Sequence, residues 1–184
     1  MHSDDDRFHP SEARVVERRH RSLRHAGNPN AGSGIVSASR RAGAAFSAAS
    51  YQSQLSRVHG DNPHRFLNVM MKGTYIVPHR HLDPPKAEAF LVLEGEVAFF
   101  IFDDLGRVVR TEVVGADPIG IDLPVGVWHT LTPVTAHAVC YEVKPGPYLA
   151  ANDKDFAPWA PREGDPAVPA YLATLMAALK SKHA

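Results

Sequence analysis

The chain has 184 residues, enough for one domain with a buried core and a tail. Its 20 Lys and Arg balance its 20 Asp and Glu, so the overall charge does not favour nucleic acid or an anionic membrane as a partner. A single cysteine, Cys140, excludes an internal disulfide framework, and no apolar run reaches the roughly 18 residues needed to cross a bilayer. Because the N-terminal MHSDDDRFHP also lacks the apolar core of a secretory signal, we expect a cytoplasmic protein.

Residues 1–32 are polar and contain few large apolar side chains, which predicts a flexible tail rather than a packed domain. Arg14, Arg18, Arg21 and His25 fall at helical spacing, so a basic helix that contacts phosphates is the alternative. A helix-turn-helix head would need three helices, and this segment is too short for them. We therefore favour the solvated tail and expect no nucleic-acid partner.

Residues 33–64 are predicted to form a helical lead-in that packs on the following domain. The stretch is rich in Ala and Ser, and we place a helix over residues 37–45. The turn sequence HGDNPH follows at residues 59–64. Because no other candidate ligand lies at ligand spacing from His59 or His64, we expect both histidines at the surface.

Residues 65–147 contain short apolar runs separated by Gly, Pro and Asp turns, which is typical of a β-sandwich or barrel rather than of βαβ units. We predict strands at 65–71, 74–80, 89–93, 96–102, 108–114, 120–123, 127–132 and 137–144. The run at 97–102 is apolar at both parities, so both faces of that strand should be covered. One cover is the domain core. The other is either the N-terminal helix or a second subunit, and on this basis we predict a homodimer.

Residues 148–184 are predicted to form a proline-rich wrap followed by a C-terminal helix. Tyr148, Phe156 and Trp159 should pin the wrap to the β-domain, because burial of a large apolar side chain contributes about 1.5–3 kcal/mol. After Asp165-Pro166, apolar residues recur at three- and four-residue spacing, which indicates a helix packed on one face.

Two histidines stand two residues apart in the run at 74–80, and we consider them candidate metal ligands. In a strand, His79 and His81 would leave the same face with Cα atoms about 6.6 Å apart. Their ring nitrogens could then approach one ion at about 2.0–2.1 Å. Glu88 opens the next apolar run, and antiparallel pairing of the two runs would return its carboxylate to the same place. His129 follows a turn at 124–126 and completes a predicted site of three histidines and one glutamate.

An isolated His-x-His pair is a weak signal in a chain with 11 histidines, so the prediction depends on the full spacing. The sequence follows GxxxxxHxHxxxxxxExxxxxxG from residue 73 and PxGxxH from residue 124. This pattern resembles the two motifs of the cupin superfamily. The resemblance implies an all-β fold, a small barrel or double-stranded jelly roll, in which these four residues hold a divalent metal. The gap before Glu88 is longer than the commonest form, and Pro133 stands where many cupins carry Asn, but neither difference removes a ligand.

The strings PHRHLDPPKAEAFLVLEG, FDDLG, PVGVWHT, EVKPGPY and NDKDFAPWAP are similar to the WbuC family of cupin-fold metalloproteins. This likeness runs from about residue 33 to near the C-terminus. It supports the cupin fold and the metal site, and with the helices predicted above we expect a β-barrel with flanking N- and C-terminal helices. The family takes its name from a gene neighbourhood of surface-polysaccharide synthesis, which implies a link to that metabolism but identifies no substrate.

A mixed nitrogen and oxygen shell excludes no first-row metal, so Fe(II), Mn(II), Ni(II) and Zn(II) stay open. A six-coordinate ion would keep two positions for water, oxygen or a substrate, as reactive sites do. Three hypotheses follow. The first is a metal-dependent isomerase, epimerase or dioxygenase acting on a small sugar or sugar-acid-like molecule. The second is a non-catalytic module in which the metal anchors a small ligand, and the third is a structural barrel with vestigial ligands.

Two further residues are candidates for substrate binding. Lys86 shares its strand parity with Glu88 and would present its ammonium group to an anionic substrate, the alternative being a solvent-exposed turn lysine. Tyr75 shares its parity with His79 and would line the cavity below that ligand. Cys140 is expected to be a small buried hydrophobic residue of the last strand.

Overall fold

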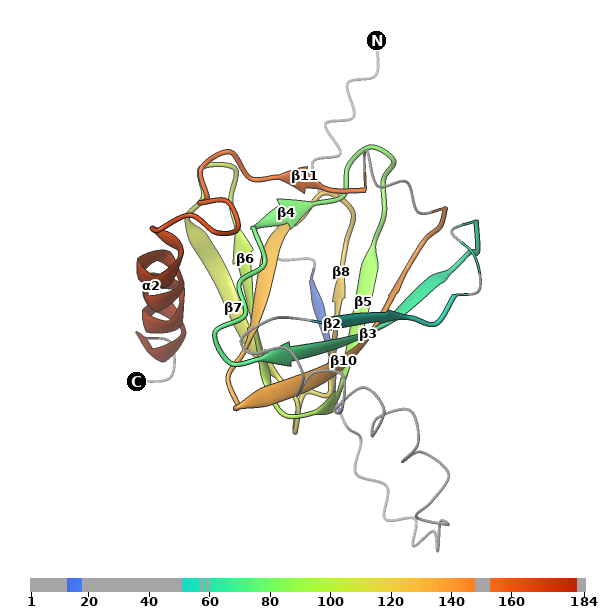
Figure 1. Cartoon of the computed structure of the whole chain (residues 1–184), viewed down its shortest axis with the longest axis horizontal. Coiled ribbons are helices and arrows are strands. Elements are labelled where there is room, and N and C mark those ends of the chain that lie inside the picture. The colour runs from blue at the N-terminus through green and yellow to red at the C-terminus, as the bar shows by residue number, and fades with distance from the viewer. Residues whose placement is uncertain (1–12, 18–50, 57, 59, 148–152, 182–184) are drawn as a thin grey trace, which may run out of the picture.

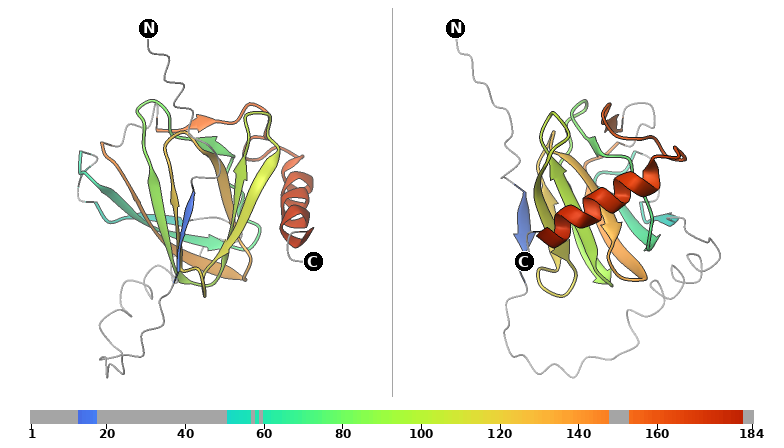
Figure 2. Two further views of the ribbon diagram at one scale, coloured as in Figure 1. Left: turned by 180° about the vertical axis from the view of Figure 1, so that it is seen from behind. Right: turned by 90° about the vertical axis from the view of Figure 1, so that its left-hand side faces the viewer.

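The computed structural model describes residues 13–17, 51–56, 58, 60–147 and 153–181, which form two antiparallel sheets and one helix (Figures 1 and 2). The six-stranded sheet has the order β1-β8-β5-β10-β3-β2, and the five-stranded sheet has the order β11-β4-β9-β6-β7. The elements are β1 (Arg14–Val16), β2 (Tyr51–Gln54), β3 (His64–Met71), β4 (His79–Arg80), β5 (Glu88–Glu94), β6 (Val97–Phe102), β7 (Val108–Val114), β8 (Gly120–Leu123), β9 (Trp128–Pro133), β10 (His137–Lys144), β11 (Asp155–Phe156) and α2 (Val168–Ser181). None of the described helical residues forms a segment long and apolar enough to cross a membrane.

Each of the predicted strands is present, but the one at 74–80 is reduced to the two residues of β4. The preceding residues are extended without a sheet ladder. The hydroxyl of Thr130 donates to the carbonyl of Ile76 at 2.6 Å, and the hydroxyl of Thr132 donates to the carbonyl of Thr74 at 2.8 Å. Side chains of β9 therefore satisfy this backbone, where Pro78 has no N–H to offer to a ladder.

Three strands lie in segments where none was predicted. β1 pairs with β8, with Arg14 opposite Asp122, so a helix at Arg14 is wrong. β2 pairs with β3 at the far edge of the same sheet, and β11 pairs with β4 at an edge of the other sheet. All three strands are too short to show an apolar periodicity in the sequence, and an edge strand needs only main-chain hydrogen bonds. The helix at 37–45, His59, Tyr148 and the rest of the basic segment lie outside the described residues.

His64 is buried, with 1% of its surface exposed, so the prediction of a surface position is wrong. It is the first residue of β3 and shares its parity with Phe66, whose ring centroid lies 5.5 Å away. The strand begins one residue earlier than predicted, and this turns the imidazole inward.

The main core lies between the two sheets. The inward residues of β6, namely Val97, Phe99 and Ile101, belong to this core. The outward residues of β6 belong to a second cluster that contains Leu175 and Leu179 of α2. Figures 1 and 2 show α2 against the outer face of the sheet that contains β6 and β7. The second cover of β6 is therefore the C-terminal helix. The homodimer stays a prediction, but the apolar outer face of β6 no longer supports it.

Leu175 tests the role of α2 as the cover of β6. It is 2% exposed, and replacing it with alanine should lower the free energy of unfolding by about 2–5 kcal/mol, because the variant loses buried apolar surface and leaves a cavity. Urea unfolding measures this change. Leu105→Ala, at a side chain that is 73% exposed, is the matched control and should have little effect. Equal stability of the two variants would contradict the packing described here.

Candidate metal centre

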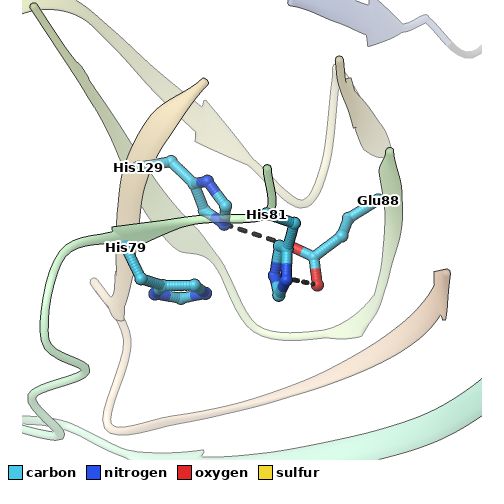
Figure 3. Close-up of side chains that lie close together, drawn as sticks. All are labelled: His79, His81, Glu88 and His129. Carbon is cyan, nitrogen blue, oxygen red and sulfur yellow. Dashed lines mark ion pairs between the residues drawn. The ribbon is translucent and has the colours of Figure 1, made fainter. Parts of the chain in front are cut away.

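The four predicted ligands converge. His79, His81, Glu88 and His129 each offer one ligand atom, and these atoms all lie within 4.8 Å of one another (Figure 3). All four side chains are buried. His79 lies on β4, His81 directly after it, Glu88 at the start of β5 and His129 on β9. The structure therefore brings all four to one place.

The route by which they meet differs from the prediction. The pairing of β4 with β9 sets His79 opposite His129, and their ring centroids are 4.5 Å apart. β5, which carries Glu88, pairs with β8 and β10 in the other sheet. Antiparallel pairing between the two halves of the first motif is therefore wrong. The chain between His81 and Glu88 crosses from one sheet to the other, and the site bridges the two.

The main chain holds the Nδ1 atom of each histidine. His79 Nδ1 lies 2.9 Å from the carbonyl oxygen of Val77, and His129 Nδ1 lies 2.9 Å from that of Val127. His81 Nδ1 contacts the carbonyl oxygen of Asp153. Because a carbonyl can only accept, each Nδ1 carries the proton and each Nε2 keeps its lone pair. Metal-binding histidines are oriented in this way.

The Glu88 carboxylate faces two of these Nε2 atoms. Its Oε1 lies 3.0 Å from His81 Nε2, and its Oε2 lies 3.0 Å from His129 Nε2 (Figure 3). These contacts lack hydrogen-bond geometry, so both Nε2 atoms and Oε2 are buried without a hydrogen-bond partner. Burying such an atom costs about 1–3 kcal/mol. A cation among them would satisfy all three, so these residues fit a metal ion.

The protonation states also suit a metal. Burial lowers the pKa of His79 well below its ordinary value, and the nearby charge of Lys154 lowers it further, so the ring is neutral. Burial by itself would raise the pKa of Glu88, but the ammonium group of Lys144, 3.3 Å from its Oε1, acts in the opposite direction and favours the ionised carboxylate. Neutral imidazoles and a carboxylate are the donor set of many first-row divalent metals.

A buried lysine stands behind the carboxylate. Lys144 Nζ lies 3.3 Å from Glu88 Oε1, 3.3 Å from Glu142 Oε1 and 3.0 Å from Asp153 Oδ2. Burial would lower the pKa of Lys144, but these three carboxylates raise it above its ordinary value. Since Asp153 also accepts from His81 through its carbonyl, this network links the ligands of the two sheets to the segment before β11.

Lys86, a candidate for substrate binding, belongs to the same network. Its ammonium group donates to Asp153 Oδ1 at 2.8 Å and to the carbonyl of Pro147 at 3.0 Å. The side chain is buried, so the alternative of an exposed turn lysine is wrong. Contact between Lys86 and a substrate stays a prediction, and these partners give it no support.

Tyr75, the other candidate, faces away from the ligands. Its hydroxyl donates to the carbonyl of Pro161 at 2.7 Å, and its ring meets Tyr171 of α2 edge-on at 6.1 Å. Ile76 lines the cavity beside His79 instead. Strand parity does not carry through Pro78, because the segment before it is not a regular strand. A role for Tyr75 in substrate binding stays a prediction without structural support.

A cavity of about 160 Å³ opens beside His79 and Glu88. Its apolar lining consists of Met70, Ile76, Phe90 and Leu131, and its polar lining of Gln52, Asn68, Glu142, Lys154 and Glu163. The sequence analysis names none of these polar residues as functional. The sequence does contain a signal that could have identified Glu142. On β10 it shares its parity with the buried Cys140, so it points inward. Burying a charge is costly, and an inward charge on an apolar strand therefore indicates a structural or chemical role. Lys154 lies in the irregular wrap and has no such signal.

Comparisons with known proteins bear on the fold. A family profile described as "Domain of unknown function (DUF6016)" matches residues 51–114. No curated protein sequence matches the chain. CapF in complex with the inhibitor 3-isopropenyl-tropolone aligns with a TM-score of 0.52 and 18% identity over 60% of this chain and 32% of the CapF chain.

Two further structures align over similar shares. The capsular polysaccharide assembling protein CapF from Staphylococcus aureus gives a TM-score of 0.50 at 19% identity, over 57% of this chain and 31% of that one. Oxalate decarboxylase from Lactobacillus farciminis, in a formate complex, gives a TM-score of 0.47 at 13% identity, over 60% of this chain and 32% of the decarboxylase chain. The aligned part of this chain thus covers about a third of the length of each of these longer proteins.

CapF is a cupin-fold protein, and it matches the two-sheet arrangement described above. This chain has the cupin fold. The predicted fold class, mainly β with the two sheets of a jelly roll, is therefore confirmed. The predicted C-terminal flanking helix is α2, whereas the predicted N-terminal flanking helix lies outside the described residues. The cupin fold and the buried cluster together make a divalent metal the expected occupant of the site, and its identity stays open.

Proposed function

We propose that this cupin binds one divalent metal through His79, His81, Glu88 and His129 and is a metal-dependent enzyme for a small polar molecule, sugar-like or sugar-acid-like. The observation that carries the proposal is the set of three imidazoles, each held at Nδ1 by a carbonyl, that converge with a carboxylate. The cavity beside them leaves room for a ligand. The occupant is Fe, Mn, Ni or Zn, all of which accept this donor set.

A bound divalent metal would supply Lewis acidity towards a carbonyl or hydroxyl oxygen. The chain's own groups have separate roles. The carbonyls of Val77 and Val127 hold two of the imidazoles in place. Lys144 keeps the carboxylate of Glu88 ionised, and the apolar side chains of the cavity limit water. Such a site suits isomerisation or epimerisation next to a carbonyl, or oxygen-dependent cleavage if the metal is iron.

The proposal extends to surface-polysaccharide metabolism. The WbuC-like strings of the sequence support this link, as does the description of the S. aureus CapF as a capsular polysaccharide assembling protein. We include membership of the WbuC family, a cytoplasmic location and a homodimer in the proposal. None of these affects the chemistry of the site.

A non-catalytic module in which the metal anchors a small ligand is the second candidate. One observation favours it. The buried carboxylate of Glu88 lines the cavity but already contacts Lys144, and a carboxylate paired with an ammonium group is a weaker base.

Metal analysis and a turnover screen test the proposal. Protein purified without chelator should contain close to one divalent metal per chain. Protein reloaded with each of the four metals should then turn over at least one member of a panel of sugars, hydroxy acids, keto acids and diols, followed by mass spectrometry and oxygen uptake. Thermal stabilisation by a panel member without turnover would favour the binding module. A chain without metal, or one that neither converts nor binds any member, would contradict the proposal.

A further inference from the structure

The described residues supply no hydrogen bond or ion pair to one ammonium group on the cavity wall. Lys154 lines the cavity with His79 and is partly buried. No carboxylate within the described part of the chain forms an ion pair with it, and no hydrogen bond reaches its side chain there. The two other lysines of the site, Lys86 and Lys144, each contact the carboxylate of Asp153. Lys154 is therefore the cation of this site that is available to a ligand.

The cavity lining places Lys154 in the same space as the metal ligands. Lys154 lines the cavity together with the ligands His79 and Glu88 and with Glu142. A ligand inside the cavity could therefore meet the metal, this ammonium group and the polar wall that contains Glu142.

The charge balance of the site favours an anion once a metal is bound. The ionisable groups around it are the carboxylates Glu88, Glu142, Asp153 and Glu163 and the ammonium groups Lys86, Lys144 and Lys154. With four acidic and three basic groups, the site has one net negative charge without metal and one net positive charge with a divalent ion. Because charges in a secluded cavity interact strongly, a singly charged anion would neutralise the loaded site. Protonation of Glu142 would make the preference for an anion stronger.

The opposite wall is arranged for hydroxyl groups. Gln52 Nε2 donates to Asn68 Oδ1 at 2.9 Å, and Asn68 Nδ2 donates to Glu142 Oε2 at 2.7 Å. This chain of hydrogen bonds orients the amide and the carboxylate that line the cavity. Amide and carboxylate oxygens accept hydrogen bonds, and hydroxyl groups can supply them.

The size of the cavity limits the ligand. Its volume of about 160 Å³ is well below the roughly 300–1,000 Å³ of sites for drug-sized ligands. A nucleotide sugar or an oligosaccharide would not fit inside it. A molecule of two to about four carbons would.

We propose that this cavity binds a small hydroxycarboxylic acid, with its carboxylate towards Lys154 and its hydroxyl groups towards the Asn68–Glu142 wall. This inference rests on the proposed function and names the substrate class of the same site. It replaces Lys86 with Lys154 as the residue that recognises an anion, because Lys86 is already paired with Asp153.

Titration calorimetry with matched probes tests the inference. Mn(II)-loaded protein should bind glycolate, glycerate or lactate, and it should bind glycerol, the neutral relative of glycerate, at least tenfold more weakly. In Lys154→Met, affinity for the acid should fall at least tenfold while metal content and melting temperature stay unchanged, because none of the described residues forms an ion pair or hydrogen bond with the Lys154 side chain. Lys154→Arg should retain most of the affinity. Lys72→Met, which removes an exposed lysine outside this cavity, should leave it unchanged.

The outcomes separate this inference from the proposed function. Equal affinity of the wild type and Lys154→Met for the acid would mean that the metal alone holds the carboxylate, and would overturn the role of Lys154. Failure of all three acids to bind protein with a full complement of Mn(II) would overturn the substrate class and leave the metal site standing. Wild-type protein that takes up no metal would overturn the proposed function and this inference together.

Discussion

Replacing His81 with alanine is expected to reduce the metal content from about one ion per chain to a small fraction of that. A site with four protein ligands binds zinc with roughly 10–16 kcal/mol, so one ligand accounts for about 3 kcal/mol. Since about 1.4 kcal/mol is a factor of ten, affinity should fall by roughly 100-fold. The Nε2 atom that the variant loses is one of three buried ligand atoms of this site that have no hydrogen-bond partner among the described residues. Elemental analysis after dialysis against a weak chelator measures the loss.

A second measurement on the same variant guards against misfolding as the cause. A metal that binds only the folded state stabilises it, so a strong chelator should lower the melting temperature of the wild type. The chelator should leave His81→Ala almost unchanged. His137→Ala is the matched control, because His137 is a half-exposed histidine that pairs with Glu94. Full metal content in His81→Ala would contradict the metal site described here.

Replacing Lys144 with methionine is expected to lower the free energy of unfolding by about 3–5 kcal/mol, the usual cost of removing one partner from a buried ion pair. The ammonium group lies within 3.3 Å of carboxylate oxygens of Glu88, Glu142 and Asp153. Methionine preserves most of the side-chain volume, so the loss is electrostatic rather than a cavity effect. Of the three carboxylates, only Asp153 would then keep an ion pair with a lysine, Lys86, among the described residues. Urea unfolding in the presence of chelator measures the change without a contribution from metal.

Arg107→Met is the control for the Lys144 variant. It removes the cation from the Arg107–Asp103 ion pair, in which the Arg107 side chain is 73% exposed. Exposed pairs contribute little to stability, so this variant should unfold close to the wild type. A Lys144→Met protein as stable as Arg107→Met would mean that the buried carboxylates take up protons or water instead of depending on the lysine.

The four candidate ligands could be predicted from the sequence because two kinds of local information coincide. The single residue between His79 and His81 places both on one face of an extended chain. Glycine at Gly73, Gly95 and Gly126 allows the positive φ angles of 88°, 73° and 76° that the turns around these ligands adopt. Spacing and turn residues are properties of short segments, and they need no knowledge of the rest of the fold.

The surroundings of the ligands could not be predicted in the same way. Parity assigned Tyr75 to the cavity, but the backbone before Pro78 bonds to threonine side chains of β9 and does not form a ladder. Parity also made Lys86 a candidate for contact with a substrate, yet Asp153, 67 residues away in the sequence, holds its ammonium group. The partner of a buried charge is chosen by long-range packing, and strand periodicity contains no information about it.

The amino-acid sequence by itself determined most of the strands between residues 65 and 144, the amphipathic C-terminal helix and the identity of the four ligand side chains, because each depends on local periodicity or on turn residues. Only the tertiary structure decided that β4 and β5 join different sheets, that α2 covers β6 and that Lys154 lines the same cavity as His79 and Glu88. These outcomes depend on which apolar faces and charges can be buried together across the whole chain. Such pairing is a property of the folded molecule, since the residues concerned are far apart in the sequence.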